Sequence, residues 1–447
     1  MRLLIGQDRI VYAGLVFLAV LMFFWPIPRT IAVRNIALVL SVLVFAYLSF
    51  QGGIHRFALS NAQKKVFYIL GAATLWFYFQ AIAISSETAW ALKELMQWAS
   101  ALVCFGLGFL VANVDDKRAK IAFFILLGTI FIHVFYIDLF AIKHFVSNQG
   151  VFPTRLDGLT EGPDKANYLT NWALALIGAE IYFRIVNSKR LIPIDSFLLG
   201  VVFVFVLISS YFETMRFGFI GLIFTFIGFL FLYLLANSAI SVSKKSTIAI
   251  FSLFAFFAFL YLGYSADSRW KTLRETVPIA LDTTNNKAWL DSKKYEYPKL
   301  SNGEMVSSSN YERPAWIKEG LILISENPLG VGYGRNAFGH ALKAKYGEGG
   351  GHSHSGIIDL GIGTGVPGMI FWVVFLGSLV YYGFSSFKKH GSYFGMALFF
   401  IASGFFFRMI VDSVIRDHML EQFMFLAGFL LTMSAREIDA KNSVSEA

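Results

Sequence analysis

Long apolar segments run through most of this chain, and they decide which folds are open to it. In residues 11–24 and 248–262, apolar side chains follow one another without a regular polar alternation. A helix needs about 20 such residues to cross the hydrocarbon core of a bilayer, whereas the strands of a membrane barrel alternate apolar and polar positions. The pattern therefore predicts an all-α integral membrane protein.

The charged residues are few and clustered. They make up 15% of the 447 residues, against about 25% in a soluble protein of ordinary composition. The net charge of +9 invites a nucleic-acid-binding interpretation. The basic residues lie mostly in short loops between apolar segments, however, as the positive-inside rule predicts, so we expect membrane lipid and no nucleic acid as a partner. The single cysteine, Cys104, excludes an intrachain disulfide and a metal site built on cysteines.

The apolar segments predict about twelve membrane-spanning helices. When both chain ends are placed in the cytoplasm, most clusters of lysine and arginine fall on cytoplasmic loops, with Arg29 and Arg34 as a local exception. The first apolar segment has no small-residue cleavage site after it, so we expect it to remain as an anchor. The expected spans lie near residues 10–26, 35–51, 66–84, 95–112, 120–140, 167–186, 196–212, 217–236, 247–264, 356–384, 393–411 and 418–434.

One connection is too long for a simple loop. Residues 265–355 have an ordinary polar composition, and we expect them to form a mainly helical periplasmic subdomain between the ninth and tenth spans. The expected organisation is therefore nine spans in residues 1–264, the subdomain, three spans in 356–434 and a cytoplasmic tail from 435 to 447.

A polar segment with two histidines, residues 351–355, leads directly into the tenth expected span. A lone exposed histidine is usually a plain loop residue, and a metal site needs further ligands, for which the sequence offers no matching cluster. A histidine titrates near neutral pH and can accept a hydroxyl proton, so His352 and His354 are candidate general bases. The sequence does not separate the two on physical grounds.

Three arginines near the outer boundary are candidate phosphate ligands, because a guanidinium group holds phosphate oxygens bidentately. Arg216 stands between two strongly apolar segments, where it can alternatively snorkel or pair with Glu213. Arg313 precedes a proline that suits a first helical turn, which places it at a helix N-terminus. The alternative is a solvated arginine paired with Glu312. Arg155 has a similar claim on weaker grounds.

Two further features have a structural and a functional interpretation. Asp412 and Asp417 stand with Arg408 and Arg416 at the outer boundary of the last two spans, where they can orient a catalytic group or form boundary salt bridges. The glycine-rich sequence at 330–334 superficially suggests a nucleotide loop. It lacks the strand–loop–helix setting and the lysine of such loops, so we interpret it as a glycine-rich turn.

These residues match the pattern of a known family. Nine residues separate the pair His354 and Ser355 from the sequence Gly-Val-Pro-Gly at 365–368, which lies in the span that follows the large outer loop. Arg216 stands at the start of the eighth span and Arg313 follows Tyr-Glu in the loop. The chain resembles bacterial O-antigen ligases, within the wider O-antigen ligase and polymerase superfamily. Met369, where members often carry a small hydroxyl residue, is a departure.

The resemblance implies a glycosyltransferase of the GT-C type that needs no metal, nucleotide or other cofactor. Its donor is a glycan on undecaprenyl pyrophosphate, and its acceptor is the lipid A–core oligosaccharide on the periplasmic face of the inner membrane. Carried over to this chain, His354 deprotonates the acceptor hydroxyl, while Arg216 and Arg313, with Arg155, bind the pyrophosphate. A single base without an obvious carboxylate nucleophile predicts inversion at the anomeric carbon. The sequence leaves the oligomeric state open.

Rival functions remain from the sequence alone. An O-antigen polymerase or a protein O-oligosaccharyltransferase would use the same donor with another acceptor. A transporter or lipid flippase, from a different class, should bury ionisable residues mid-membrane in broken, repeat-related helices. His133 and Asp138 in the fifth span favour that alternative, but the other candidate polar residues gather on one face and no repeat is evident. A purely structural membrane protein leaves these residues without a role.

Overall fold

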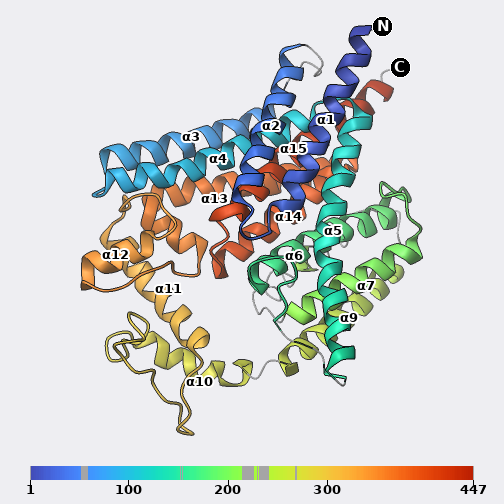
Figure 1. Cartoon of the computed structure of the whole chain (residues 1–447). Coiled ribbons are helices and arrows are strands. Elements are labelled where there is room, and N and C mark those ends of the chain that lie inside the picture. The colour runs from blue at the N-terminus through green and yellow to red at the C-terminus, as the bar shows by residue number, and fades with distance from the viewer. Residues whose placement is uncertain are drawn as a thin grey trace.

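The computed structural model describes residues 2–51, 59–148, 150–151, 153, 155–213, 226–228, 230, 241–266 and 269–445. Within these ranges the protein is all-α, as the apolar pattern predicts (Figure 1). The pairing of Lys299 with Met305 is an isolated bridge and not part of a named strand. The helices are α1 (Arg2–Phe24), α2 (Ile31–Phe50), α3 (Asn61–Ala83), α4 (Thr88–Ala112), α5 (Asp116–Ser147), α6 (Pro163–Asn187), α7 (Ser196–Glu213), α9 (Val242–Ala266), α10 (Arg269–Leu281), α11 (Ser308–Glu326), α12 (Ala337–Tyr346), α13 (Gly356–His390), α14 (Tyr393–Val411) and α15 (Asp417–Ser445).

The protein is a multi-pass membrane protein. Among the described residues, the helices α2 to α7, α13 and α14 are long and apolar enough to cross a bilayer, eight in all. The expected span at 217–236 lies almost wholly outside the described residues, and the one at 247–264 falls within α9. The total of twelve spans therefore stays a prediction.

Close packing of the helices depends on small residues at their crossings. A Cβ atom added at Gly108 of α4 would lie 2.1 Å from the backbone oxygen of Phe425 in α15. Reciprocally, a Cβ atom at Gly428 would lie 2.2 Å from the backbone oxygen of Phe105. The two backbones therefore touch directly, which is how helices associate in a medium where apolar side chains gain little by leaving lipid.

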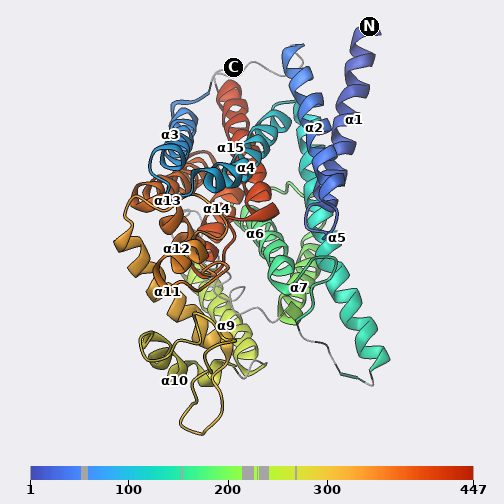
Figure 2. The same ribbon diagram turned by 60° about the vertical axis from the view of Figure 1, so that its left-hand side comes forward.

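The two chain ends lie at one end of the molecule, and the α10–α11 region lies at the opposite end (Figures 1 and 2). Residues 282–355 enclose a core of their own, in which Trp289, Tyr311 and Phe338 are buried. Ile358 and Ile362, from the first turns of α13, complete the same core. The subdomain is therefore anchored on the helix that follows the histidine segment.

The helix α13 is interrupted at Gly365, which has φ 71° and ψ 179°. Pro367 has no N–H, so it leaves the carbonyl of Gly363 without its usual helical donor. The backbone N–H of Gly332 supplies that donor at 2.9 Å. A Cβ atom at Gly330, where φ is +84°, would lie 2.4 Å from the nitrogen of Gly365. The glycine-rich segment is therefore a turn, as interpreted from the sequence, and it also closes the kink in α13.

Candidate functional site

The segment that carries the two histidines is held by hydrogen bonds to its own neighbours. The backbone N–H of Ser353 donates to Oδ1 of Asp359 at 2.8 Å, and its hydroxyl donates to the backbone oxygen of Ser355 at 2.9 Å. Between these serines, His354 adopts a left-handed conformation with φ 54°. That conformation costs about 1–2 kcal/mol for a residue with a Cβ atom. The buried serines and Asp359 hold the backbone in it.

The half-buried ring of His354 contacts two other rings. The Trp316 indole is stacked on one side, with ring centroids 5.3 Å apart and planes at 14°. The His352 imidazole lies at a centroid distance of 4.2 Å. Trp316 is three residues after Arg313 in α11, a spacing that places both side chains on one face of the helix. The helix α11 thus supplies both a ring and a positive charge to the histidine.

The structure corrects the position of Arg313 within its helix. The sequence places Arg313 at a helix N-terminus because Pro314 follows it, but α11 begins at Ser308 and Pro314 lies inside the helix. Pro314 has no N–H to donate to the backbone oxygen of Asn310, so it removes one hydrogen bond from the helix. The Glu312 carboxylate accepts a hydrogen bond from the Tyr297 hydroxyl, and Arg313 is half-buried.

The surroundings of His354 favour its neutral form. Burial, together with the positive charges of Arg313 and Arg416, lowers its pKa to about 4, against an opposing contribution from Asp164. These charges reach the ring from three elements: α11, the α14–α15 loop and the start of α6. The site therefore combines a neutral imidazole with nearby positive charges. Such a combination suits a general base that works beside a bound anion.

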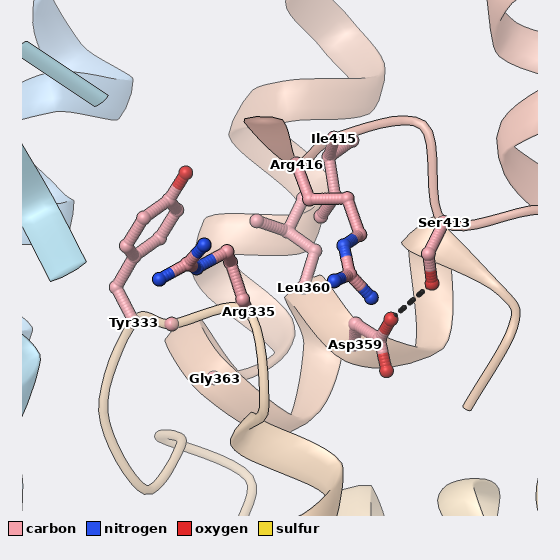
Figure 3. A pocket seen from close by; sticks show the side chains of 9 residues that line it. Tyr333, Arg335, Asp359, Leu360, Gly363, Ser413, Ile415 and Arg416 are labelled. Carbon is pink, nitrogen blue, oxygen red and sulfur yellow. Dashed lines mark hydrogen bonds between the residues drawn. The ribbon is translucent and has the colours of Figure 1, made fainter. Parts of the chain in front are cut away.

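Arg416 also contacts the second histidine directly. Its Nη1 atom lies 2.6 Å from Nδ1 of His352. On its other side Arg416 borders a pocket in which its guanidinium group lies near the Asp359 carboxylate, and Asp359 accepts a hydrogen bond from the Ser413 hydroxyl (Figure 3). The pocket is lined by Tyr333, Gly334, Arg335, Asp359, Leu360, Gly363, Ser413, Ile415 and Arg416.

A buried polar network joins the end of α7 to the start of α13. Arg408, which is 2% exposed, pairs with Asp412 at 3.0 Å between Nη2 and Oδ2 and donates to Oδ1 of Asn167 at 2.9 Å. Asn167 in turn donates to Glu213 at 2.6 Å. The backbone oxygen of Asp412 accepts from the N–H of Gly356, at 3.1 Å. Asp412 is thus a structural link to the histidine segment, through an ion pair that is buried and not a surface boundary pair.

The remaining predicted site residues are Arg216, Arg155 and Asp417. Arg216 lies outside the described residues, three positions after the end of α7. Arg155 is exposed in the α5–α6 loop with φ 61°. The next residue, Leu156, donates its N–H to the backbone oxygen of Phe212 at 3.2 Å, so this loop lies beside the end of α7. Asp417 is the first residue of α15.

Sequence reasoning missed three residues around His354. Trp316 could have been found from its three-residue spacing after Arg313, and Asp164 from the Gly-Pro-Asp sequence that starts α6. Asp359 gives no such signal, because its role depends on how the chain turns back at Ser353. Among the residues that the structure describes, no group of three His, Cys, Asp or Glu side chains is placed to hold a metal ion.

Comparison with known proteins bears on this arrangement. Residues 201–373 match a family described as O-antigen ligase. The matched region contains Arg216, Arg313, His352 and His354, together with α11, α12 and the first half of α13. No curated protein matches the chain. The match of residues 201–373 supports a relationship of this chain to the O-antigen ligase and polymerase superfamily.

Proposed function

We propose that the protein is an O-antigen ligase, which transfers a glycan from undecaprenyl pyrophosphate to the lipid A–core oligosaccharide. The observation that carries this proposal is the placement of His354. It lies in the family-matched region, at the start of a membrane-spanning helix, stacked on Trp316 and under the influence of the charges of Arg313 and Arg416. A base in this position meets substrates that are themselves held at a membrane surface.

The chemistry of such a donor asks little beyond these groups. A sugar on a lipid pyrophosphate is already activated, so the reaction needs no nucleotide. The barrier lies in activating a weak hydroxyl nucleophile and in stabilising charge on the leaving group. General base catalysis contributes about 10²–10⁴-fold, and cations held in place near the leaving group can contribute as much or more. His354 supplies the base, and the arginines supply the cations.

Arg313 and Arg216 bind the pyrophosphate in this mechanism, and Arg155 is a further phosphate ligand. The charge of Arg313 already lowers the pKa of His354 in the free protein, which supports a position of Arg313 close to the base. The leaving group and the base then occupy neighbouring positions. The acceptor hydroxyl gives its proton to His354 and attacks the anomeric carbon, while the bond from that carbon to the pyrophosphate oxygen breaks and undecaprenyl pyrophosphate leaves. This direct displacement inverts the configuration. No step requires a metal ion.

Binding of the donor also prepares the base. Arg313 and Arg416 help to keep the pKa of His354 near 4 in the free protein. A pyrophosphate bound at Arg313 carries negative charge that offsets the Arg313 cation, so its binding raises the pKa of His354 toward the ordinary value. A base is most effective when its pKa lies near the working pH. His354 therefore becomes an effective base only once the donor is in place.

The proposed orientation follows from charge and from topology. Residues 265–355 form the periplasmic subdomain, and residues 356–434 supply the last three of twelve spans. The protein lies in the bacterial inner membrane. Residues 435–447 and the N-terminus face the cytoplasm. The two chain ends share one end of the molecule, opposite the α10–α11 region, in agreement with this orientation (Figure 2).

A reconstitution experiment tests the proposed function. The purified protein in nanodiscs receives undecaprenyl-pyrophosphate glycan and lipid A–core, with EDTA and without nucleotide. We expect a glycan–lipid A–core conjugate with inverted anomeric configuration. Longer lipid-linked glycans without conjugate would instead identify a polymerase. Transfer to an added protein acceptor would identify an O-oligosaccharyltransferase. A donor that stays unchanged under all conditions would favour a transporter.

A further inference from the structure

The two histidines do not have the same hydrogen-bonding freedom. A neutral imidazole has one N–H group and one nitrogen lone pair, so it can donate once and accept once. Arg416 lies 2.6 Å from Nδ1 of His352. A guanidinium group has only donors. Nδ1 of His352 must therefore be the acceptor in this bond, and its single proton, in the neutral ring, sits on Nε2.

This bond removes the basic site of His352. To take a proton, the ring would have to use Nδ1, which would break the hydrogen bond and set a second positive charge against the Arg416 guanidinium. Coulomb repulsion between two such close cations opposes protonation of His352, and it is stronger in a half-buried site than in water. The Nε2–H group that remains can only donate.

We propose that Arg416 is a positioning residue that divides the roles of the histidine pair. By binding Nδ1, it holds His352 as a spectator ring packed against His354 and leaves His354 as the base. This inference rests on the proposed function for the identity of the reaction, but the hydrogen bond can be tested without that function. It also supplies the physical distinction between His352 and His354 that the sequence alone does not give.

The packing supports a positioning role. The His354 ring contacts the Trp316 ring at a centroid distance of 5.3 Å and the His352 ring at 4.2 Å. Trp316 is fixed by its own hydrogen bond, from Nε1 to the backbone oxygen of Trp289, at 2.8 Å. Arg416 gives His352 the equivalent support from the α14–α15 loop. Without that bond, His352 loses a contact that orients its ring against His354.

The first arm of the test is chemical modification. Diethyl pyrocarbonate acylates the unprotonated nitrogen of an imidazole, and mass spectrometry locates the modified residue. We expect His354 to react in the wild-type protein and His352 to be protected, and we expect Arg416→Met to make His352 reactive. Arg335→Met is the matched control, because Arg335 borders the same pocket but pairs with Glu94 at 3.1 Å. Equal reactivity of His352 in the wild-type and Arg416→Met proteins would overturn the proposal.

The second arm is kinetic. We expect Arg416→Met to lower kcat by about 10–100-fold, the size of effect that misplaced catalytic groups produce, with the KM for the donor unchanged. Arg416→Gln should recover part of this loss, since its amide N–H can still donate to Nδ1. If Arg416 acts through His352, Arg416→Met and His352→Phe will be non-additive in the double variant. A raised donor KM, or fully additive losses, would assign Arg416 to substrate binding instead and contradict the proposal.

The two arms separate the two possible failures. If the wild-type protein forms no conjugate but the modification pattern changes as expected, the proposed function is wrong and the role of Arg416 in the histidine pair stands. If conjugate forms and His352 is equally reactive with and without Arg416, the function stands and the positioning role is wrong.

Discussion

The imidazole ring of His354 stacks on the indole ring of Trp316, with centroids 5.3 Å apart and ring planes at 14°. Trp316 is in turn held at the backbone oxygen of Trp289, so α11 and the segment before it determine where the histidine ring can lie. This contact connects α11 to the segment that leads into α13. The helix α11 therefore has a direct part in the candidate site.

Substitution of Trp316 should therefore change the rate of transfer. We expect Trp316→Leu to lower kcat by about 10–100-fold, because the ring plane that orients His354 is lost. Trp316→Phe keeps an aromatic face and should retain most of the rate, although it loses the hydrogen bond to Trp289. Steady-state assays on both variants, with thermal unfolding as a check on folding, measure the effect. Equal rates for the leucine and phenylalanine variants would show that the stack does not orient the base.

Removal of Arg313 should weaken the interaction with the donor. We expect Arg313→Ala to lower kcat/KM for the lipid-linked glycan by at least about 100-fold, since one cation near the leaving group is lost. Arg313→Lys should recover only part of that loss, because lysine keeps the charge but lacks the bidentate fork. Titration of the acceptor provides the control, and its KM should change little. Full activity in the lysine variant would argue against a bidentate phosphate contact.

The rate should respond to pH through His354. The neutral ring is the active form, and its pKa lies near 4 in the free protein, so kcat/KM should stay level from pH 8 down to about pH 5 and fall below that. Arg313 contributes to the low pKa, and its replacement by glutamine removes a repulsive positive charge. The pKa of His354 should then rise, and the acid limb should move to higher pH. Superimposable profiles for the two proteins would contradict this assignment.

The buried pair of Arg408 and Asp412 should matter for stability. Asp412→Asn leaves the Arg408 charge buried without its counter-ion, which costs about 3–5 kcal/mol in comparable sites. We expect a clear fall in Tm in detergent, together with loss of activity, because the ion pair with Arg408 holds Asp412 in the place where its backbone oxygen accepts from the N–H of Gly356. Glu161→Gln, which breaks the exposed pair of Glu161 with Lys165, is the matched control and should cost at most about 1 kcal/mol. Similar Tm values for the two variants would show that the buried pair is not structurally important.

The sequence predicts the fold class and the family well because both depend on local patterns. Continuous apolar segments identify the membrane helices, and the spacing between His354 and the Gly-Val-Pro-Gly sequence at 365–368 is visible without any contact being known. The sequence also identifies Arg313, although the helix that carries it begins earlier than Pro314 suggests.

The remaining features of the site depend on contacts between distant segments. Arg416 lies 62 positions after His354, on the α14–α15 loop, and no local pattern connects it to His352. Asn167 and Arg408 are 241 positions apart and meet only because α6 and α14 pack together. The hydrogen bond from Gly332 to the backbone oxygen of Gly363 also joins distant segments. It forms because Pro367 has no N–H to donate to that oxygen.

The most direct test of the account is the transfer reaction of His354→Ala in nanodiscs, measured beside the wild-type protein with the same donor and acceptor. We expect the variant to insert and unfold like the wild type and to form conjugate at least about 100-fold more slowly, since a general base contributes at least this factor. His352→Ala, measured in parallel, should keep a reduced but measurable rate. Conjugate formed by His354→Ala at the wild-type rate would contradict the assignment of His354 as the base.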